Sequence, residues 1–178
     1  MRRVLLLLVL LVSGCGSQAA EPLPDARSAE PQAAVLNWRE SYPATGERLV
    51  FGVRSFELTE EGWSSEISIE NRTKIPFDLG ESPPLAFGLM LLPDDDLKTL
   101  DKMTSRSGLL LREPTTIEPG PPTMLAPGET WRAKISAPGS LADSAYLRVS
   151  FGPLVAVGKP PKGMQPNVVW ITDRSYRL

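Results

Sequence analysis

The sequence contains no histidine and a single cysteine, and these two absences exclude several kinds of functional site. Without histidine, the chain lacks the commonest general base and the commonest metal ligand of proteins. One cysteine cannot form an intrachain disulfide or a cysteine-rich metal centre. Basic residues are not in excess either, with 19 Lys and Arg against 21 Asp and Glu, so no basic field gathers a nucleic acid. We therefore expect no metal, no cofactor and no nucleic-acid partner.

Proline and glycine, by contrast, are abundant. The 18 prolines and 14 glycines are about 18% of the 178 residues, against about 12% in average proteins. Such frequent breakers divide the chain into short segments and argue against a helical bundle. Hydrophobic residues at 42% and charged residues at 22% are typical of a globular protein, and the length suits one domain.

The N-terminus combines a short basic segment with an apolar run. Arg2 and Arg3 precede nine apolar residues, 4–12, and two small residues follow. Nine residues are too few for a membrane-spanning helix, which needs about 20, but they match the apolar region of a secretory signal peptide. A membrane helix or an N-terminal core helix is the alternative, and the end of the apolar character at Cys15 counts against it.

The tetrapeptide VSGC at residues 12–15 resembles the lipobox of bacterial lipoproteins. The resemblance implies a diacylglyceryl group on Cys15 and removal of residues 1–14 as the signal peptide. Two or three acyl chains would attach the mature protein firmly to a membrane. Gly16, rather than an aspartate, follows the cysteine, which implies the outer membrane where the host has two membranes. We expect a lipid-anchored protein on the extracytoplasmic side of the cell envelope.

The segment after the cysteine has the composition of a tether. Residues 15–34 are rich in Ala, Pro, Glu, Ser and Gln and hold a single Leu, so they cannot bury enough apolar surface to offset chain entropy. We predict a lipidated cysteine and disordered tether over residues 15–34, and a folded domain over residues 35–178.

From Arg48 onward, apolar and polar residues alternate at the period of a β-strand. A slip in the alternation predicts a β-bulge near Arg54 and Ser55. An acidic run, residues 94–96, precedes apolar residues at helical spacing and predicts a short helix over residues 95–104. Seven to eight short strands with one helical insertion are typical of a β-sandwich. The predicted strands lie at residues 48–58, 66–70, 75–79, 87–92, 131–136, 147–151 and 168–172, with weaker patterns at 109–111 and 115–117.

Two short motifs resemble passages of bacterial extracytoplasmic Ig-like domains. Residues 69–77, IENRTKIPF, are similar to a strand-to-strand passage, and residues 125–131, LAPGETW, are similar to a later turn that leads into a strand. The resemblance implies an Ig-like β-sandwich that serves in binding, adhesion or assembly, although a fold by itself does not fix function. The acidic helical insertion and a long C-terminal loop depart from the simplest Ig-like pattern.

No motif predicts catalysis, so we expect the protein not to be an enzyme. The sequence has no G-x-S-x-G elbow, no S-x-x-K pair and no glycine-rich phosphate loop. Glu66 and Glu70 share a strand face and could in principle act as a carboxylate pair, but a solvated strand surface explains them more simply. Residues 94–96 could bind Ca²⁺, but they lack the glycine of an EF-hand loop, and helix capping accounts for them. The sequon at residues 71–73 is explained by its role in a turn.

Two places are candidate interaction surfaces. Trp63 begins a strand beside a turn, where an exposed tryptophan could anchor a partner. Residues 152–166 are a proline-rich loop, and such a loop loses little entropy on binding, which makes Pro160, Pro161 and Met164 the candidate contacts. Core packing for the tryptophan and a plain connection for the loop are the alternatives.

We therefore expect a lipid-anchored, non-enzymatic module that binds or helps to assemble another envelope component, either a protein or a polysaccharide. Two alternatives stay open. One is a proteinase inhibitor that inserts its proline-stiffened loop into a protease cleft. The other is an envelope hydrolase, which requires a cleft with two carboxyl groups about 5–10 Å apart.

Overall fold

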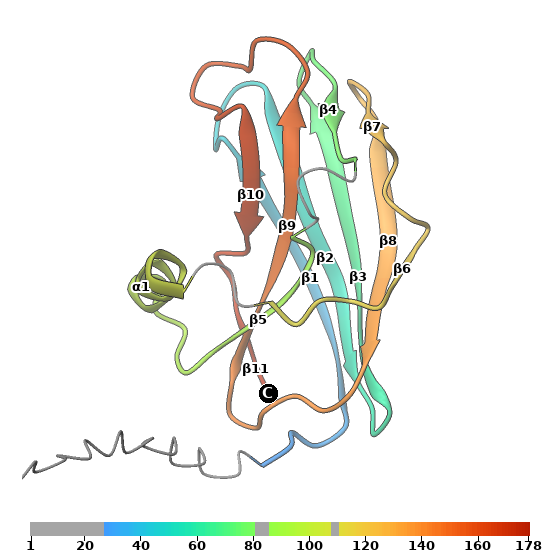
Figure 1. The fold of residues 1–178 in the computed structure, drawn as a ribbon, viewed down its shortest axis with the longest axis vertical. Helices are drawn as coiled ribbons and strands as arrows, with labels where there is room; N and C mark the ends of the chain where they lie inside the picture. The colour runs from blue at the N-terminus through green and yellow to red at the C-terminus, as the bar shows by residue number, and fades with distance from the viewer. Residues whose placement is uncertain (1–26, 81–85, 108–110) are drawn as a thin grey trace, which may run out of the picture.

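The computed structural model describes residues 27–80, 86–107 and 111–178. In these residues two antiparallel sheets pack face to face, and one helix lies beside the second sheet (Figure 1). This arrangement confirms the predicted all-β sandwich with one short helical insertion. Seven of the described strands have five or more residues, and six of these were predicted. The seventh is β1, and the predicted strand at residues 75–79 is the two-residue β4; four strands of two or three residues bring the total to eleven.

Each sheet is built around long antiparallel strands. The first sheet has the order β1-β2-β3-β8-β6, and β9 is central to the second, with β10 and β11 along one edge and β4 and β5 along the other. β7 pairs with β4. The strands are β1 (Gln32–Tyr42), β2 (Arg48–Leu58), β3 (Gly62–Arg72), β4 (Phe77–Asp78), β5 (Gly88–Leu92), β6 (Thr116–Glu118), β7 (Met124–Leu125), β8 (Thr130–Pro138), β9 (Tyr146–Ala156), β10 (Asn167–Ile171) and β11 (Tyr176–Arg177).

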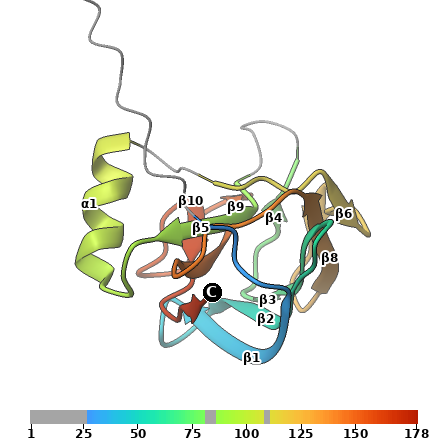
Figure 2. The ribbon, with the colours of Figure 1, turned by 90° about the horizontal axis from the view of Figure 1, so that it is seen from below.

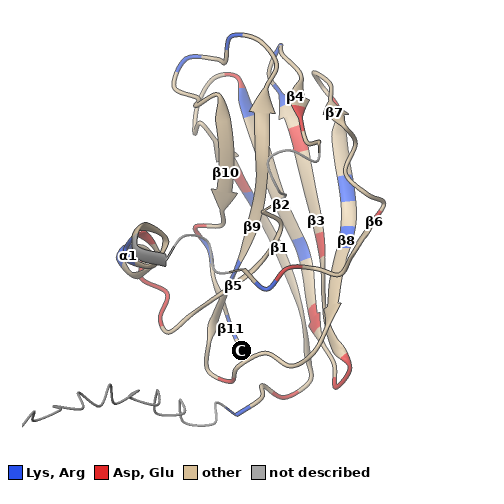
Figure 3. Cartoon of the chain, in the orientation of Figure 1, with Lys and Arg blue, Asp and Glu red and all other residues tan. Residues whose placement is uncertain are grey.

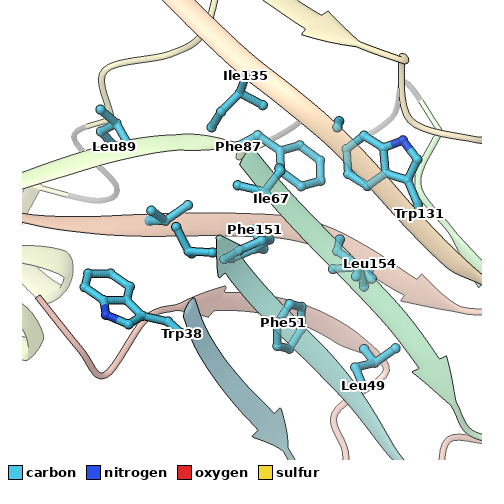
Figure 4. Close-up of a cluster of buried hydrophobic side chains, with 14 of the residues drawn as sticks. Trp38, Leu49, Phe51, Ile67, Phe87, Leu89, Trp131, Ile135, Phe151 and Leu154 are labelled. Atoms are coloured by element: carbon cyan, nitrogen blue, oxygen red, sulfur yellow. The ribbon is translucent and has the colours of Figure 1, made fainter. Parts of the chain in front are cut away.

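The core lies between the sheets and is filled by every second residue of each long strand (Figure 4). Aromatic rings connect the two layers, with 5.2 Å between the ring centroids of Phe51 and Phe151 and 5.4 Å between those of Phe87 and Trp131. Burial of each such side chain stabilises the fold by about 1.5–3 kcal/mol. The inward-facing residues that the alternation predicted are all buried: Leu49, Phe51, Val53, Ile67, Ile69, Trp131, Ala133, Ile135, Leu147, Val149 and Phe151.

Strand β9 differs from the prediction in its length and in its outer face. It continues to Ala156, so residues 152–156 belong to a strand and not to the C-terminal loop. Arg148 and Ser150, which the alternation placed in solvent, are buried. The reason is the helix α1 (Leu97–Ser107), which covers this outer face, as Figure 2 shows by its place beside β5 and away from β1. A second small core forms beneath it from Met90, Leu92 and Leu100.

Strand β1 is the main element that the alternation did not predict. It begins at Gln32, inside the range assigned to the tether, and Ser28 already pairs with Ala142. A bulge between Val35 and Trp38 interrupts the alternation, and Val35 is 77% exposed. The facing slip in β2 lies between Val53 and Ser55, which confirms the predicted bulge.

The remaining boundaries shift by a few residues. The helix starts and ends two to three residues later than predicted. The weak pattern at residues 115–117 corresponds to β6, whereas the pattern at 109–111 falls mostly outside the described residues.

The two turn motifs that resemble Ig-like domains are joined by one buried side chain. The Asn71 amide nitrogen donates to the carbonyls of Ile75 at 2.8 Å and Leu125 at 3.0 Å, and its oxygen accepts from the Thr73 amide at 3.0 Å. Gly128, at a φ of +78° in the second motif, donates its amide to the Asn71 carbonyl at 2.7 Å. Asn71 has no exposed surface, so its role is to hold two turns together and not to carry a glycan.

Candidate functional site

The described chain begins at one end of the sandwich, so the two ends can be told apart (Figure 1). We call the end where the chain enters the proximal end. There the Ala29 amide donates to the Leu141 carbonyl at 2.9 Å, next to the connection at residues 139–145. We call the opposite end the distal tip. It is formed by the turns at residues 43–47, 73–76 and 126–129 and by the loop at residues 157–166.

The loop at residues 157–166 is held to the distal tip by backbone hydrogen bonds. At its base the Ala156 amide donates to the Pro166 carbonyl at 2.8 Å, and the Val157 amide donates to the Pro76 carbonyl at 3.0 Å. A turn inside the loop bonds the Met164 amide to the Pro161 carbonyl at 3.1 Å. The loop is thus closed at its base, bonded to the turn at Pro76 and stiffened by an internal turn.

The structure does not bring the four predicted contact residues together. Trp63 is 4% exposed and belongs to the core at the proximal end, so the prediction that it anchors a partner is wrong. Met164 is 6% exposed and packs into the core beneath the loop, so it is not a surface contact. Pro160 and Pro161 are half-buried on the distal tip and remain candidates. Cys15 lies outside the described residues.

The loop presents charge beside its prolines. Lys159 and Lys162 flank the proline pair, and both side chains are exposed. Neither forms an ion pair with another described residue. The distal tip therefore offers two free ammonium groups on a pinned loop.

A groove crosses the outer face of the first sheet, where the charged positions of the alternating strands gather. Its larger depression has a volume of about 360 Å³, and a smaller one of about 210 Å³ shares Arg54 and Ser68 with it. We call the two together the sheet groove. Figure 3 shows basic positions on β8, and the basic residues of this strand are Arg132 and Lys134. The larger depression is lined by Arg54, Glu66, Ile67, Ser68, Glu118, Arg132, Ala133 and Lys134.

Arginine–glutamate pairs neutralise part of this face. Arg54 lies 3.5 Å from Glu66, and Glu70 accepts from Arg72 at 2.5 Å and from Arg39 at 2.6 Å. The hydrogen bond from Arg72, assisted by Arg39 and opposed by partial burial, holds the pKa of Glu70 below its ordinary value of 4.5.

Three charged groups of the sheet groove have no such partner. Arg132, Lys134 and Glu118 form no ion pair with any described residue, although Lys134 stands opposite Glu118 in the β6–β8 register. All three side chains are exposed. They are free to bind a ligand.

Two charged residues that the sequence analysis did not single out form hydrogen bonds to the segment at residues 170–174. The Glu40 carboxylate, on the inner face of β1, accepts from the Trp170 indole at 2.9 Å and from the amides of Asp173 at 2.9 Å and Arg174 at 3.1 Å. The Arg148 guanidinium donates to the carbonyls of Thr172 and Asp173, and to that of Asp95 at 2.6 Å. Both residues grip the turn between β10 and β11 and are structural.

The acidic run before α1 is used locally. Asp94 accepts from the Asp96 amide and the Thr99 hydroxyl, both at 3.0 Å, and Asp96 accepts from the Lys98 amide at 2.9 Å. These bonds are the N-terminal capping that the sequence predicted. Among the described residues, no three acidic, histidine or cysteine side chains are grouped as metal ligands.

Comparison of the chain with protein-family models, curated proteins and solved structures finds no match. In the part of the chain that the structure describes, no helix has the length and apolar character needed to cross a membrane.

Proposed function

We propose that the protein is a lipid-anchored, non-enzymatic module of the bacterial cell envelope that binds or helps to assemble an envelope partner. The lipobox-like residues 12–15 support the anchor and the extracytoplasmic location, in the outer membrane where there are two membranes. The Ig-like resemblance of residues 69–77 and 125–131 supports a binding role, because domains of that kind mostly serve in binding and assembly.

The observation that carries the proposal is the position of the loop at residues 157–166 on the distal tip. The described chain begins at the proximal end, where Ser28 pairs with Ala142, so an anchor on Cys15 is attached through the end of the sandwich opposite the distal tip. The loop at residues 157–166 is already ordered by its hydrogen bonds and by buried Met164, and a pre-ordered loop gives up little entropy on binding. Exposed Lys159 and Lys162 supply charge for an acidic partner surface.

The anchor is tested by mass spectrometry of the mature protein. We expect an N-terminal Cys15 that carries acyl chains, and we expect Cys15→Ala to be released from membranes or left unprocessed. Wild-type protein with residues 1–14 intact and no lipid would refute the anchor.

The binding role is tested by crosslinking the tagged, lipid-anchored protein in intact cells. We expect an envelope component to be captured reproducibly, and we expect the double variant Lys159→Gln/Lys162→Gln to capture less of it. The control is Lys98→Gln/Lys102→Gln, which removes the same charge from exposed positions of α1. Equal capture by the two double variants would show that the distal tip is not the contact surface.

The same loop supports the alternative of a proteinase inhibitor, because a stiff exposed loop suits a protease cleft. The crosslinked partner decides between the two. A protease as the captured partner, with inhibition by the purified protein, would favour the inhibitor.

A further inference from the structure

We propose that the sheet groove binds an acidic polysaccharide, a chain of sugars that carry carboxylates. The inference rests on the proposed function as a binding module and adds a ligand class and a second surface. The residues that we assign to ligand contact are Arg132 and Lys134 of β8, together with Ser68, Glu66 and Glu118.

The charge of the sheet groove favours an anionic ligand. Arg54, Arg132 and Lys134 face two carboxylates in the larger depression, while the whole chain has a net charge of −2. Arg54 is occupied by Glu66 at 3.5 Å, so the available cations are Arg132 and Lys134. They are two residues apart on one face of β8, about 7 Å along the strand. An arginine fork binds a carboxylate through two hydrogen bonds, and the neighbouring ammonium adds a third contact.

The other polar groups of the groove favour a sugar over a simple polyanion. Glu118, which forms no ion pair with a described residue, would repel a polyanion whose side chains are carboxylates alone, such as polyglutamate. A sugar hydroxyl, in contrast, donates to a carboxylate oxygen and accepts from a serine hydroxyl. Ser68 stands opposite Arg132 in the β3–β8 register and so offers a hydroxyl beside the guanidinium. A ligand with both carboxylates and hydroxyls matches this mixture.

The location of the groove argues against an extended peptide. Peptides commonly bind a sheet by adding a strand to its edge, where free backbone groups pair with them. The groove instead lies on the face of the sheet, where β3 is paired on both sides with β2 and β8, and β8 is paired with β6 over residues 134–136. Only side chains are available for recognition there.

The shape of the groove suits a chain more than a small molecule. The two depressions share Arg54 and Ser68 and together reach from β1 to β6. Five adjacent strands at about 4.8 Å spacing place the outer two about 19 Å apart. The floor is low at Gly52, where a Cβ atom would lie 2.5 Å from the Ser68 hydroxyl. A linear polymer can therefore lie across the strands.

The test measures binding of the purified, full-length lipidated protein in detergent by titration calorimetry. The probe is polygalacturonate, compared with its methyl ester, which keeps the sugars and removes the charge, and with polyglutamate, which keeps the charge and removes the sugars. We expect polygalacturonate to bind at least about tenfold more tightly than either comparison polymer. The methyl ester loses the carboxylate contacts to Arg132 and Lys134, and polyglutamate loses the hydroxyl contacts to Ser68 and Glu118.

The matched variants compare the groove with the distal tip. We expect Arg132→Gln/Lys134→Gln to weaken polygalacturonate binding by about tenfold or more, and Lys159→Gln/Lys162→Gln, with the same change of charge, to weaken it less than about twofold. Both pairs are exposed, so equal unfolding temperatures serve as the check on folding.

Three results would overturn the inference: no binding by the wild-type protein, equal loss in the two double variants, or polyglutamate binding as tightly as polygalacturonate. The crosslinking experiment reports separately on the distal tip. Equal capture by the two lysine double variants, with intact polygalacturonate binding, would remove the proposed tip contact and leave the groove. Reduced capture by Lys159→Gln/Lys162→Gln, with no polygalacturonate binding, would remove the groove alone.

Discussion

Arg148 carries a positive charge in the interior, 1% exposed and without a carboxylate partner among the described residues. Burial of an unpaired charge is unfavourable, and the guanidinium is tolerated because it donates to three main-chain carbonyls. Those carbonyls belong to the approach to α1 and to the turn between β10 and β11. One side chain therefore attaches the helix and the C-terminal strands to β9.

The first prediction concerns this side chain. Arg148→Ala leaves three carbonyls without their donor and opens a cavity, and the relief of the buried charge offsets only part of the loss. We expect the free energy of unfolding in urea to fall by about 2–4 kcal/mol. Ser150→Ala is the control, because its hydroxyl is buried on the same face with no partner in the described structure, and we expect it to be neutral or slightly stabilising. An Arg148→Ala protein as stable as the wild type would show that the three hydrogen bonds of Arg148 are dispensable.

Glu70 gives the molecule a weak dependence on acid. Because Arg72 and Arg39 lower its pKa in the folded state, its ionised form stabilises the fold above the unfolded pKa near 4.5. That stabilisation is lost as the pH falls through the lower folded value. Both arginines are about half exposed, so solvent screens the pair, and we expect Glu70→Gln to cost about 0.2–1 kcal/mol at pH 7.

The measurement is the difference in unfolding free energy between wild type and Glu70→Gln, followed from pH 7 to pH 3. We expect the difference to shrink below pH 4.5. Glu57→Gln, at an exposed position of β2 without an ion pair, is the control and should show no such trend. A difference that stays constant with pH would contradict the assignment.

At the scale of elements, α1 depends on its N-terminal cap. The Asp96 carboxylate accepts from the Lys98 amide at 2.9 Å, whereas no hydrogen bond involves the side chain of Asp95 in the described structure. We expect Asp96→Ala to weaken the helix by about 1 kcal/mol and Asp95→Ala to have little effect. Hydrogen exchange is the measurement, because the α1 amides should exchange faster while those of β3 and β8 stay protected. Equal protection of α1 in both variants would exclude the cap.

The strands whose two faces could be assigned from the sequence are those with one buried and one solvated face. β2, β3 and β8 alternate clearly because their outer side chains reach water. β9 is covered on both faces, so Arg148 is buried although arginine is usually exposed. No local sequence pattern reveals the helix that covers it. In β1 the bulge breaks the alternation, and Glu40 occupies an inward position because a partner in β10 satisfies it.

The candidate sites show the same division between local pattern and tertiary contact. Trp63 has the parity of Ile67 and Ile69 along β3, and this signal predicts its burial better than its place beside a turn. Burial of Met164 has no local signal, because it follows from contacts with distant residues. The alternation of residues 131–136 places Arg132 and Lys134 on the outer face, but the groove that they line exists only because five strands align in register. Side-chain direction was thus predictable, and the meeting of strands was not.

For the whole molecule, the chain's only cysteine makes the orientation on the membrane measurable. If Cys15 is lipidated, a cysteine introduced elsewhere is the sole reactive thiol, as in Ser140→Cys at the proximal end or Lys162→Cys on the distal tip. We expect a fluorophore at residue 140 to be quenched more strongly by brominated lipids than one at residue 162, because the described chain begins at the proximal end, where Ser28 pairs with Ala142. Both side chains are exposed, so labelling itself does not disturb the core. Equal quenching would mean that neither end of the sandwich is held closer to the membrane, and the distal tip would then lose its advantage as the surface that meets a partner.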